Sequence, residues 1–409
     1  MREATASSKE RTNLMPMAKT AAEAMARIDQ NDAQLRAWVY VDRNAAKAEA
    51  RGGPLSGIPF GVKDLYDVAG MPTRFGLNWG IESAPIDAWC VAALRAAGAV
   101  PIGKTHTTAL AYRDPAPTRN PHNLEHTPGG SSAGSAAAVG AGHVPFALGT
   151  QTVGSGLRPA SFCGVVGYKP TYGVIPVQGM APYAPSLDTV AIISANVEIA
   201  ARVMSVFAPE FDSTPRGVPH VGYAPKAFAN RFEPETLAVL QKTANAIAQA
   251  GAHVEQIELP SIVDETSAPT AAHWSIVSFE ANAVLGPLRV HGFPPLLEEF
   301  IAAASKVSYE AYQTALAQRA RTRPQIAAML AKYDVLLLGC ANPAPGLDST
   351  GDTTPLTPWS FWGVPSLSLP VARSAKGLPI GVQLVAAPGC DDKLLRAARW
   401  IEAKGLTGF

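Results

Sequence analysis

The stretch that most constrains the fold of this chain runs from Thr127 to Pro159. Its sequence, TPGGSSAGSAAAVGAGHVPFALGTQTVGSGLRP, is dominated by glycine, serine and alanine and carries almost no charge. Residues this small let backbone segments approach each other closely, and a run without charge belongs in the interior rather than at the surface. Two small-residue turns, 129–132 and 154–156, flank a helix-like segment. The serines of these turns are therefore the first candidates for chemistry.

The composition predicts a large globular core and a small-molecule partner. Charged residues are 16% of the 409, and glycine and proline contribute 35 each, whereas charged residues are about 25% of an average domain. The formal net charge of +1 gives no electrostatic reason to expect nucleic acid or an anionic membrane as a partner. The four cysteines form no CxxC pair, which argues against a disulfide framework or a cysteine zinc site. Without a signal-peptide pattern or a membrane-length apolar run, the expected location is cytoplasmic.

The alternation of strand-like and helix-like segments predicts an α/β fold. A helix is expected over 87–98, between strand-like pieces, and another should end at Gly251 before a further strand. Residues 271–333 read as mostly helical, and the tail gives three buried strands and a closing helix. We expect a single domain over 1–409, with a central mixed β-sheet covered by helices on both faces.

The N-terminal part is expected to be helical after a loose start. Residues 1–18 show no clear pattern and are predicted to be loose. Apolar residues recur at helical spacing over 19–50, and Asn31 and Asp32 are predicted to separate two helices.

Two familiar site patterns can be set aside. The stretch from His122 to His126 spells HxxEH, a zinc pattern when it lies on a helix, but Pro121 and Pro128 bracket it. We therefore predict a loop with two ordinary histidines and no metal. The glycine turns also fail as phosphate sites, because neither completes a P-loop or a GxGxxG motif.

The remaining possibility is a serine nucleophile whose proton is removed by a lysine. Ser155 is not in a GxSxG elbow, and no serine has a lysine three residues later. Lysine can remove a serine proton only when neutral, and burial favours the neutral form. Lys63 lies in the apolar piece IPFGVKDLYD, although a structural ion pair with Asp64 or Asp67 is an equally open interpretation. Between two glycines, Ser155 suits a sharp turn whose N–H groups converge on a carbonyl, but a plain flexible turn is the alternative.

Three blocks together closely resemble the amidase signature family. They are GVKD at 61–64, PGGSSAGSAAAVGAG at 128–142 and LGTQTVGSGLRPASFCGVVGYKPT at 148–171, and positions 131 and 155 have the family's interval of 24 between catalytic serines. The resemblance covers nearly the whole chain. It implies the amidase signature fold, no cofactor, and substrate specificity in a variable region at roughly 200–345, where Trp274 and Phe279 are candidates for lining the pocket.

The resemblance also implies the roles of individual residues. Ser155 would be the nucleophile, Ser131 the relay after a cis peptide bond, and Lys63 the base of a Ser-cisSer-Lys triad. It further implies that the backbone N–H groups of Thr152, Val153, Gly154 and Ser155 form an oxyanion hole. The residues implied to bind substrate are Gly130, Thr150 and Arg158.

Three positions bear on the predicted subgroup of the family and on its substrate. Val153 stands where the family often has glycine, and Gln151 stands where it has aspartate. The segment is similar to malonamidase-like members, in which the arginine at the place of Arg158 holds a substrate carboxylate, and GSG-x-x-P also resembles allophanate hydrolases. A structural Arg158, bonded to backbone carbonyls, is an equally weighted alternative.

The sequence thus predicts a cofactor-independent amidohydrolase that cleaves a small amide through an acyl-enzyme on Ser155, with an anionic amide held by Arg158 as one version. An allophanate or ureide hydrolase stays open. So does the glutaminase subunit of a tRNA-dependent amidotransferase, which would need a partner. A non-catalytic binding protein with the same fold is the alternative from another class. Dimers are common among similar enzymes, so a homodimer is one open assembly, and the sequence does not fix the oligomeric state.

Overall fold

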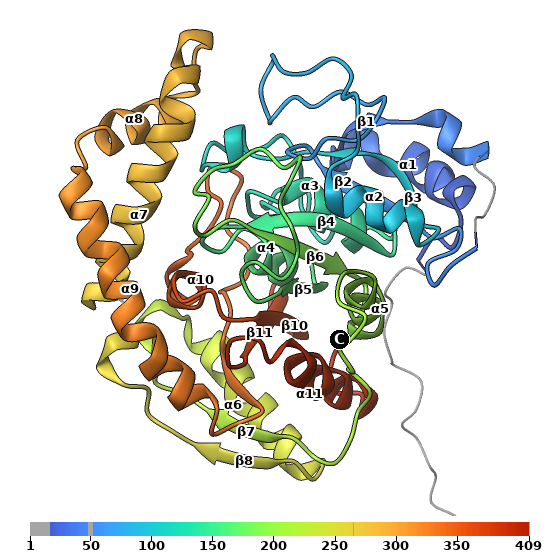
Figure 1. Ribbon diagram of the computed structural model, residues 1–409. Helices are drawn as coiled ribbons and strands as arrows, with labels where there is room; N and C mark the ends of the chain where they lie inside the picture. The colour runs from blue at the N-terminus through green and yellow to red at the C-terminus, as the bar shows by residue number, and fades with distance from the viewer. Residues whose placement is uncertain (1–16, 48–51, 265, 409) are drawn as a thin grey trace, which may run out of the picture.

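Eleven strands form one sheet in the computed structural model, which describes residues 17–47, 52–264 and 266–408 (Figure 1). In spatial order the strands are β1 (Trp38–Val41), β3 (Val100–Thr105), β2 (Pro59–Lys63), β4 (Phe146–Gln151), β6 (Thr189–Ser194), β5 (Val166–Lys169), β10 (Ser366–Arg373), β11 (Pro379–Val385), β9 (Val335–Gly339), β7 (His220–Tyr223) and β8 (His253–Gln256). β2 runs parallel to β3 and β4, whereas β4, β6, β5, β10 and β11 are successively antiparallel. The predicted single α/β domain with a mixed sheet is confirmed.

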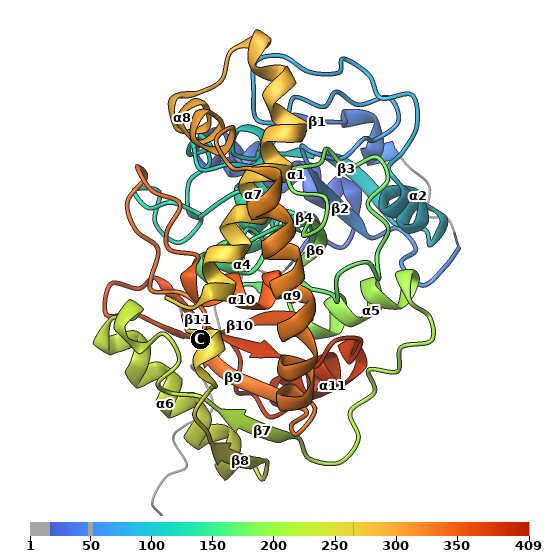
Figure 2. The same cartoon turned by 60° about the vertical axis from the view of Figure 1, so that its left-hand side comes forward.

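Helices cover both faces of this sheet. The α-helices are α1 (Ala21–Leu35), α2 (Trp89–Ala96), α3 (Ala133–Gly140), α4 (Leu157–Phe162), α5 (Val197–Phe207), α6 (Pro234–Gln249), α7 (Ala268–Leu285), α8 (Pro295–Ala304), α9 (Tyr309–Leu330), α10 (Thr357–Phe361) and α11 (Asp391–Ala403). The 3-10 helices are η1 (Arg43–Lys47), η2 (Ala109–Ala111), η3 (Ala229–Arg231), η4 (Ser261–Val263), η5 (Gly286–His291) and η6 (Thr354–Leu356). Figure 2 shows the long helices α7 and α9 side by side along the side of the molecule that faces the viewer. Among the described helices, none combines the length and apolar character needed to cross a membrane.

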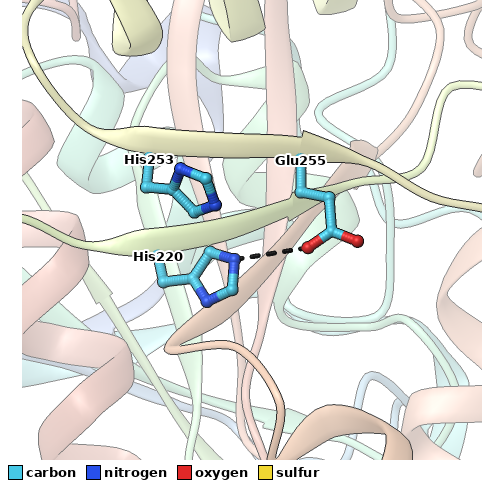
Figure 3. A group of neighbouring side chains, drawn as sticks. All are labelled: His220, His253 and Glu255. Carbon is cyan, nitrogen blue, oxygen red and sulfur yellow. Dashed lines mark ion pairs between the residues drawn. The ribbon is translucent and has the colours of Figure 1, made fainter.

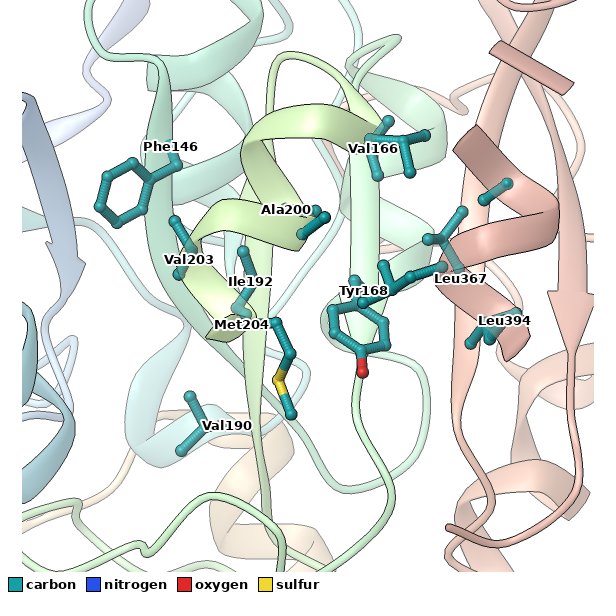
Figure 4. Packing of buried hydrophobic residues seen from close by; sticks show 14 of the residues in the cluster. Phe146, Val166, Tyr168, Val190, Ile192, Ala200, Val203, Met204, Leu367 and Leu394 are labelled. Atoms are coloured by element: carbon teal, nitrogen blue, oxygen red, sulfur yellow. The ribbon is translucent and has the colours of Figure 1, made fainter. Parts of the chain in front are cut away.

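Strand β4 shows how the two faces are filled. Phe146 and Leu148 belong to the largest apolar cluster, to which α5 contributes, whereas Ala147 between them belongs to a separate cluster that includes α3. This is the alternation expected of a strand with both faces buried. Figure 4 shows Phe146 near Val203 of α5 and Ile192 of the neighbouring strand. The catalytic candidates at and after the end of β4 are therefore attached to a strand that is packed on both faces.

The prediction of two helices over 19–50 was wrong. α1 runs without a break through Asn31 and Asp32, and β1 follows it as an edge strand paired antiparallel with β3. The helix ends at Leu35, because Arg36 takes a left-handed conformation (φ 54°), and the Asp32 carboxylate then accepts the N–H of Ala37 (2.8 Å). Of the segment predicted to be loose, residues 1–16 lie outside the described residues, and Ala18 is buried.

The other local predictions hold. α2 and α6 match the predicted helices, residues 271–333 are mostly helical, and the tail forms β9, β10, β11 and α11. The HxxEH stretch lies in turns, as predicted: His122 Nε2 contacts the carbonyl of Cys163 at 2.9 Å, and His126 Nδ1 contacts that of Ala344 at 2.8 Å. The two imidazoles thus face different backbone groups rather than one shared point.

Candidate active site

The centre of the candidate site is Lys63, the last residue of β2. All five residues of this strand are buried, because β3 and β4 flank it and both faces are covered. The side-chain nitrogen of Lys63 donates to Ser131 Oγ and to Thr150 Oγ1, both at 2.6 Å. Three residues singled out from the sequence are therefore in direct contact.

The electrostatic surroundings of Lys63 favour its neutral form. Burial lowers the pKa of Lys63 well below its ordinary value, and the charge of Asp188 opposes this shift only in part. The alternative of an ion pair with Asp64 is wrong, since Asp64 Oδ1 lies 3.0 Å from Lys104 Nζ on the neighbouring strand. In the described part of the chain, no ion pair within 4 Å links Lys63 to a carboxylate.

The segment that carries Ser131 has the backbone that the resemblance predicts. The peptide bond between Gly130 and Ser131 is cis. A Cβ on Gly130 would lie 2.9 Å from Thr350 Cγ2 and 3.0 Å from Thr108 Cγ2, so only glycine fits between these two threonines. Ser131 itself is buried. Gly130 is thus enclosed by the chain, and its carbonyl accepts a hydrogen bond from Arg158 Nη2 at 2.6 Å.

Ser155 lies in the turn that follows β4, next to the Ser131 segment. It is half-buried, in contrast to its fully buried neighbours. Its carbonyl accepts the N–H of Ser132 at 3.3 Å. The hydroxyl of Ser132 in turn bonds both backbone groups of Thr150, accepting from the N–H (3.1 Å) and donating to the carbonyl (3.2 Å). These bonds hold the two serine-bearing segments together beside Lys63.

Two side chains that sequence reasoning left without a role fix the loop on both sides of Ser155. Gln151 Oε1 accepts the N–H groups of Gly156 and Leu157, both at 3.0 Å, and Gln151 Nε2 donates to Ser360 Oγ at 3.2 Å. Ser360, on α10, donates to the carbonyl of Val153 at 2.6 Å. The amide that replaces the family's aspartate therefore serves both ends of the turn, since it can accept and donate at once.

Asp188 is a further site residue that the sequence did not reveal. Its Oδ1 accepts from Thr152 Oγ1 at 2.6 Å, and its Oδ2 accepts the N–H groups of Tyr183 and Ala184 at 2.8 and 3.0 Å. Burial raises the pKa of Asp188, and these hydrogen bonds oppose the shift. No local pattern marks Asp188, because its partners become neighbours only in the folded chain.

The N–H groups of residues 152–155, which the resemblance predicts to form an oxyanion hole, are not engaged by the rest of the described chain. In the described residues, none of them donates a hydrogen bond to the protein, although buried backbone N–H groups are nearly always paired. Val153 accommodates its side chain by burying it in an apolar cluster with Leu110 and Tyr183. Gly154 has no such room, since a Cβ there would lie 2.7 Å from Leu356 Cδ1.

Arg158 makes the contacts of a structural arginine. It is 4% exposed, and besides its bond to Gly130 its Nη1 donates to the carbonyl of Gly351 at 2.7 Å. Burial, reinforced by the nearby charge of Arg113, lowers the pKa of Arg158 to about 9. Arg158 thus joins the cis peptide to the segment around Gly351.

Two cavities adjoin the segments that form the site. One of about 580 Å³ is mostly apolar and includes Leu65 and Leu110 in its wall. The other, of about 720 Å³, is more polar and includes Arg113, Gly351 and Asp352. The predicted pocket residues Trp274 and Phe279 line neither of these cavities; Phe279 stacks on Tyr312 instead.

Comparison with known proteins identifies the family. The family model Amidase matches residues 17–395. A glutamyl-tRNA(Gln) amidotransferase subunit of Moorella thermoacetica is 32% identical over 446 residues, which cover 91% of this chain and 90% of the relative. A solved amidase structure superposes with a TM-score of 0.86 at 30% identity, covering 95% of this chain and 97% of the other. The peptide amidase of Stenotrophomonas maltophilia gives a TM-score of 0.81 at 26% identity, with coverage of 95% and 93%.

These comparisons confirm the family resemblance but not the finer similarity to malonamidase-like members. The family match spans the described catalytic candidates, from Lys63 to Ser155, together with every strand of the sheet from β1 to β11. The chain therefore belongs to the Amidase family of amide-hydrolysing enzymes.

Proposed function

We propose that the chain hydrolyses the C–N bond of a small amide through an acyl-enzyme on Ser155. The main support is the distance of 2.6 Å between Lys63 Nζ and the hydroxyl of Ser131, in a setting where burial favours the neutral amine. Ser155 lies on the adjoining turn and is more accessible than the residues around it.

The proposed proton path runs from Ser155 through Ser131 to Lys63. As Ser155 Oγ attacks the amide carbonyl, its proton passes to Ser131 Oγ, and the proton of Ser131 passes to the neutral amine of Lys63. The N–H groups of Thr152, Val153 and Gly154 stabilise the negative oxygen of the tetrahedral intermediate. The proton then returns along the same path to the departing amine, and water hydrolyses the acyl-enzyme with Lys63 again acting as base.

A serine substitution with a matched control tests this proposal. Ser155→Ala is expected to abolish both ammonia release from a panel of small amides, ureides and aryl amides and labelling by a fluorophosphonate. Ser205→Ala, which removes an exposed hydroxyl on α5 that bonds only its own helix, is expected to change neither. Labelling that survives Ser155→Ala would contradict the assignment of the nucleophile.

A preference for an anionic amide is the more specific version of this proposal. A guanidinium has five N–H groups, and Arg158 uses one each from Nη1 and Nη2 for the two backbone carbonyls, while its buried Nε lacks a partner. The remaining donors can hold a substrate carboxylate, as in malonamidase-like enzymes. Turnover of malonamate and of its neutral diamide analogue should therefore be compared in the native chain and in Arg158→Lys. A selective loss for malonamate supports the clamp, whereas an equal loss for both substrates supports the structural role alone.

A glutaminase role within an amidotransferase is the second candidate. It is favoured by the relatives named as glutamyl-tRNA(Gln) amidotransferase subunits, which match at 30–32% identity over most of both chains. Ammonia release from glutamine should then depend on a co-purifying partner. Efficient hydrolysis of simple amides by the isolated chain, with no partner recovered, would contradict it.

A further inference from the structure

Three side chains of the types that ligate metal ions lie together at the edge of the sheet opposite to β1. This cluster consists of His220 on β7 and of His253 and Glu255 on β8 (Figure 3). β7 and β8 are parallel, with His220 directly opposite His253. Because side chains alternate along a strand, Glu255 projects from the same face as His253. The strand pairing therefore places two imidazoles and one carboxylate together.

The separations within the cluster are close to those of ligands that share one ion. One potential ligand atom from each residue can be chosen so that all three lie within 4.8 Å of one another. His220 Nε2 is buried without a hydrogen bond, and Glu255 Oε2 lies 3.5 Å from it. Two ligands on one tetrahedral zinc ion are about 3.4 Å apart, given metal–ligand bonds of about 2.0–2.1 Å. The pair His220–Glu255 already has this spacing, and the exposed His253 ring lies beside His220, with ring centroids 4.5 Å apart.

The backbone around the cluster is held by more than the strand pairing. The N–H of His220 donates to Asp334 Oδ2, and the N–H of Asp334 donates to the carbonyl of His220, both at 2.9 Å. The ring of Tyr333 packs edge-on against the His220 ring, with centroids 4.9 Å apart. Among the three residues, His220 is thus the fixed one.

We propose that His220, His253 and Glu255 form a binding site for a divalent transition-metal ion of the zinc type, with water completing its coordination. Imidazole nitrogen together with carboxylate oxygen is a ligand set typical of zinc-type ions. Magnesium and calcium prefer oxygen ligands instead. The site is separate from the catalytic centre, since six inter-strand steps along the sheet lead from β4 to β7, or about 29 Å at about 4.8 Å a step. The bound ion joins β8, the last strand of the sheet, to β7 and takes no part in amide hydrolysis.

Calorimetric titration of the chelator-treated full chain with zinc chloride tests the site. The native chain is expected to bind one zinc ion. Loss of a residue that merely orients a metal ligand costs about 10–100-fold in affinity, so His253→Ala and Glu255→Gln are each expected to weaken binding by more than tenfold. His291→Ala, which removes an exposed histidine on η5, is the matched control and is expected to leave the affinity unchanged. No saturable binding by the native chain, or equal affinity in all variants, overturns the proposal.

Two further readouts separate a metal site from a loss of folding. Cobalt in place of zinc should give visible absorption bands in the native chain and in His291→Ala but not in His253→Ala. Zinc at a hundredfold excess over its dissociation constant should raise the melting temperature of the native chain by about 3 °C, and should not shift that of Glu255→Gln. Amide hydrolysis should be the same with zinc and with chelator. Activity that disappears with the metal would overturn the placement of this ion outside catalysis.

Discussion

Two buried lysines on neighbouring parallel strands, Lys63 on β2 and Lys104 on β3, have opposite surroundings. Both are fully buried, and burial lowers the pKa of each. Lys104 contacts the carboxylate of Asp64 at 3.0 Å, which counteracts this shift, and it also donates to Thr73 Oγ1 and the Pro72 carbonyl, both at 2.8 Å. Within the described residues, the hydrogen bonds of Lys63 Nζ go only to hydroxyls. The partners of a buried lysine, more than its burial, therefore decide how strongly the amine is held as a cation.

The largest expected effect is on activity. Lys63→Met should lower kcat/KM by about 10⁴-fold or more, because no other group in the described part of the site is placed to receive the serine proton. Lys104→Met makes the same change one strand away and should keep kcat/KM within a few-fold per folded molecule. Steady-state kinetics normalised to folded protein would measure both. Similar losses in the two variants would show that burial, and not the partner, is what matters.

The second effect is on stability. Here Lys104, and not Lys63, is the lysine whose replacement is expected to cause the larger loss. Lys104→Met should lower the free energy of unfolding by about 3–5 kcal/mol, because it leaves the Asp64 carboxylate buried without its cation. Denaturant unfolding would measure this loss. The double variant Lys104→Met/Asp64→Asn should recover most of it, since no buried charge is then unpaired. A Lys104→Met chain as stable as the native one would refute the structural role of the pair.

The third effect is the pH dependence of stability. The pKa of Lys63 is lower in the folded than in the unfolded chain, so between these two values the unfolded chain binds more protons and the native chain gains stability as pH rises. Relative to Lys63→Met, the gain should reach about 1.4 kcal/mol for each pH unit within this window, which lies below pH ~10.4. Denaturant unfolding of both chains at several pH values would measure it. A difference that falls with rising pH would mean that Lys63 is held as a cation.

The smallest effect concerns one hydrogen bond to Lys63. Thr150→Val removes the hydroxyl that accepts from Lys63 Nζ, and this acceptor favours the protonated amine. The pKa of Lys63 should fall further, and the acid limb of the kcat/KM profile should move to lower pH, with a loss in rate of about 5–10-fold. Thr150→Ser should restore the native profile, since it keeps the hydroxyl. A shift of the acid limb to higher pH would contradict the proposed neutral base.

The fold and the candidate catalytic site could be predicted from the sequence to different extents. Local patterns indicated the α/β alternation, and the family's motifs assigned Lys63, Ser131 and Ser155 to one site. β1 was missed because its four residues, Trp38–Val41, continue the apolar spacing of the preceding helix, and only pairing with β3 makes them a strand.

The residues that hold the candidate site in place could not be predicted from the sequence, for a different reason. Asp188 and Ser360 act on the oxyanion segment from 36 and 207 positions away, through contacts with Thr152 and Val153. Nothing in their immediate neighbours differs from an ordinary strand start or helix. Whether Lys63 is paired with Asp64 also depended on Lys104. Lys104 takes Asp64 as its partner because β2 and β3 lie side by side, which the local sequence does not show.

The ties between the catalytic loop and the C-terminal third of the chain set the order in which function arises during synthesis. Lys63, Ser131 and Ser155 have all left the ribosome before Gly351 and Ser360, which hold Arg158 and the Val153 carbonyl. β5 also lacks its partner β10 until residues 366–373 are made. A nascent or truncated chain ending near residue 345 therefore carries all three candidate catalytic residues without the contacts that Gly351 and Ser360 make to the loop around them. We therefore expect hydrolytic activity only after the segment from Gly351 to Ser360 has been made and has folded against this loop.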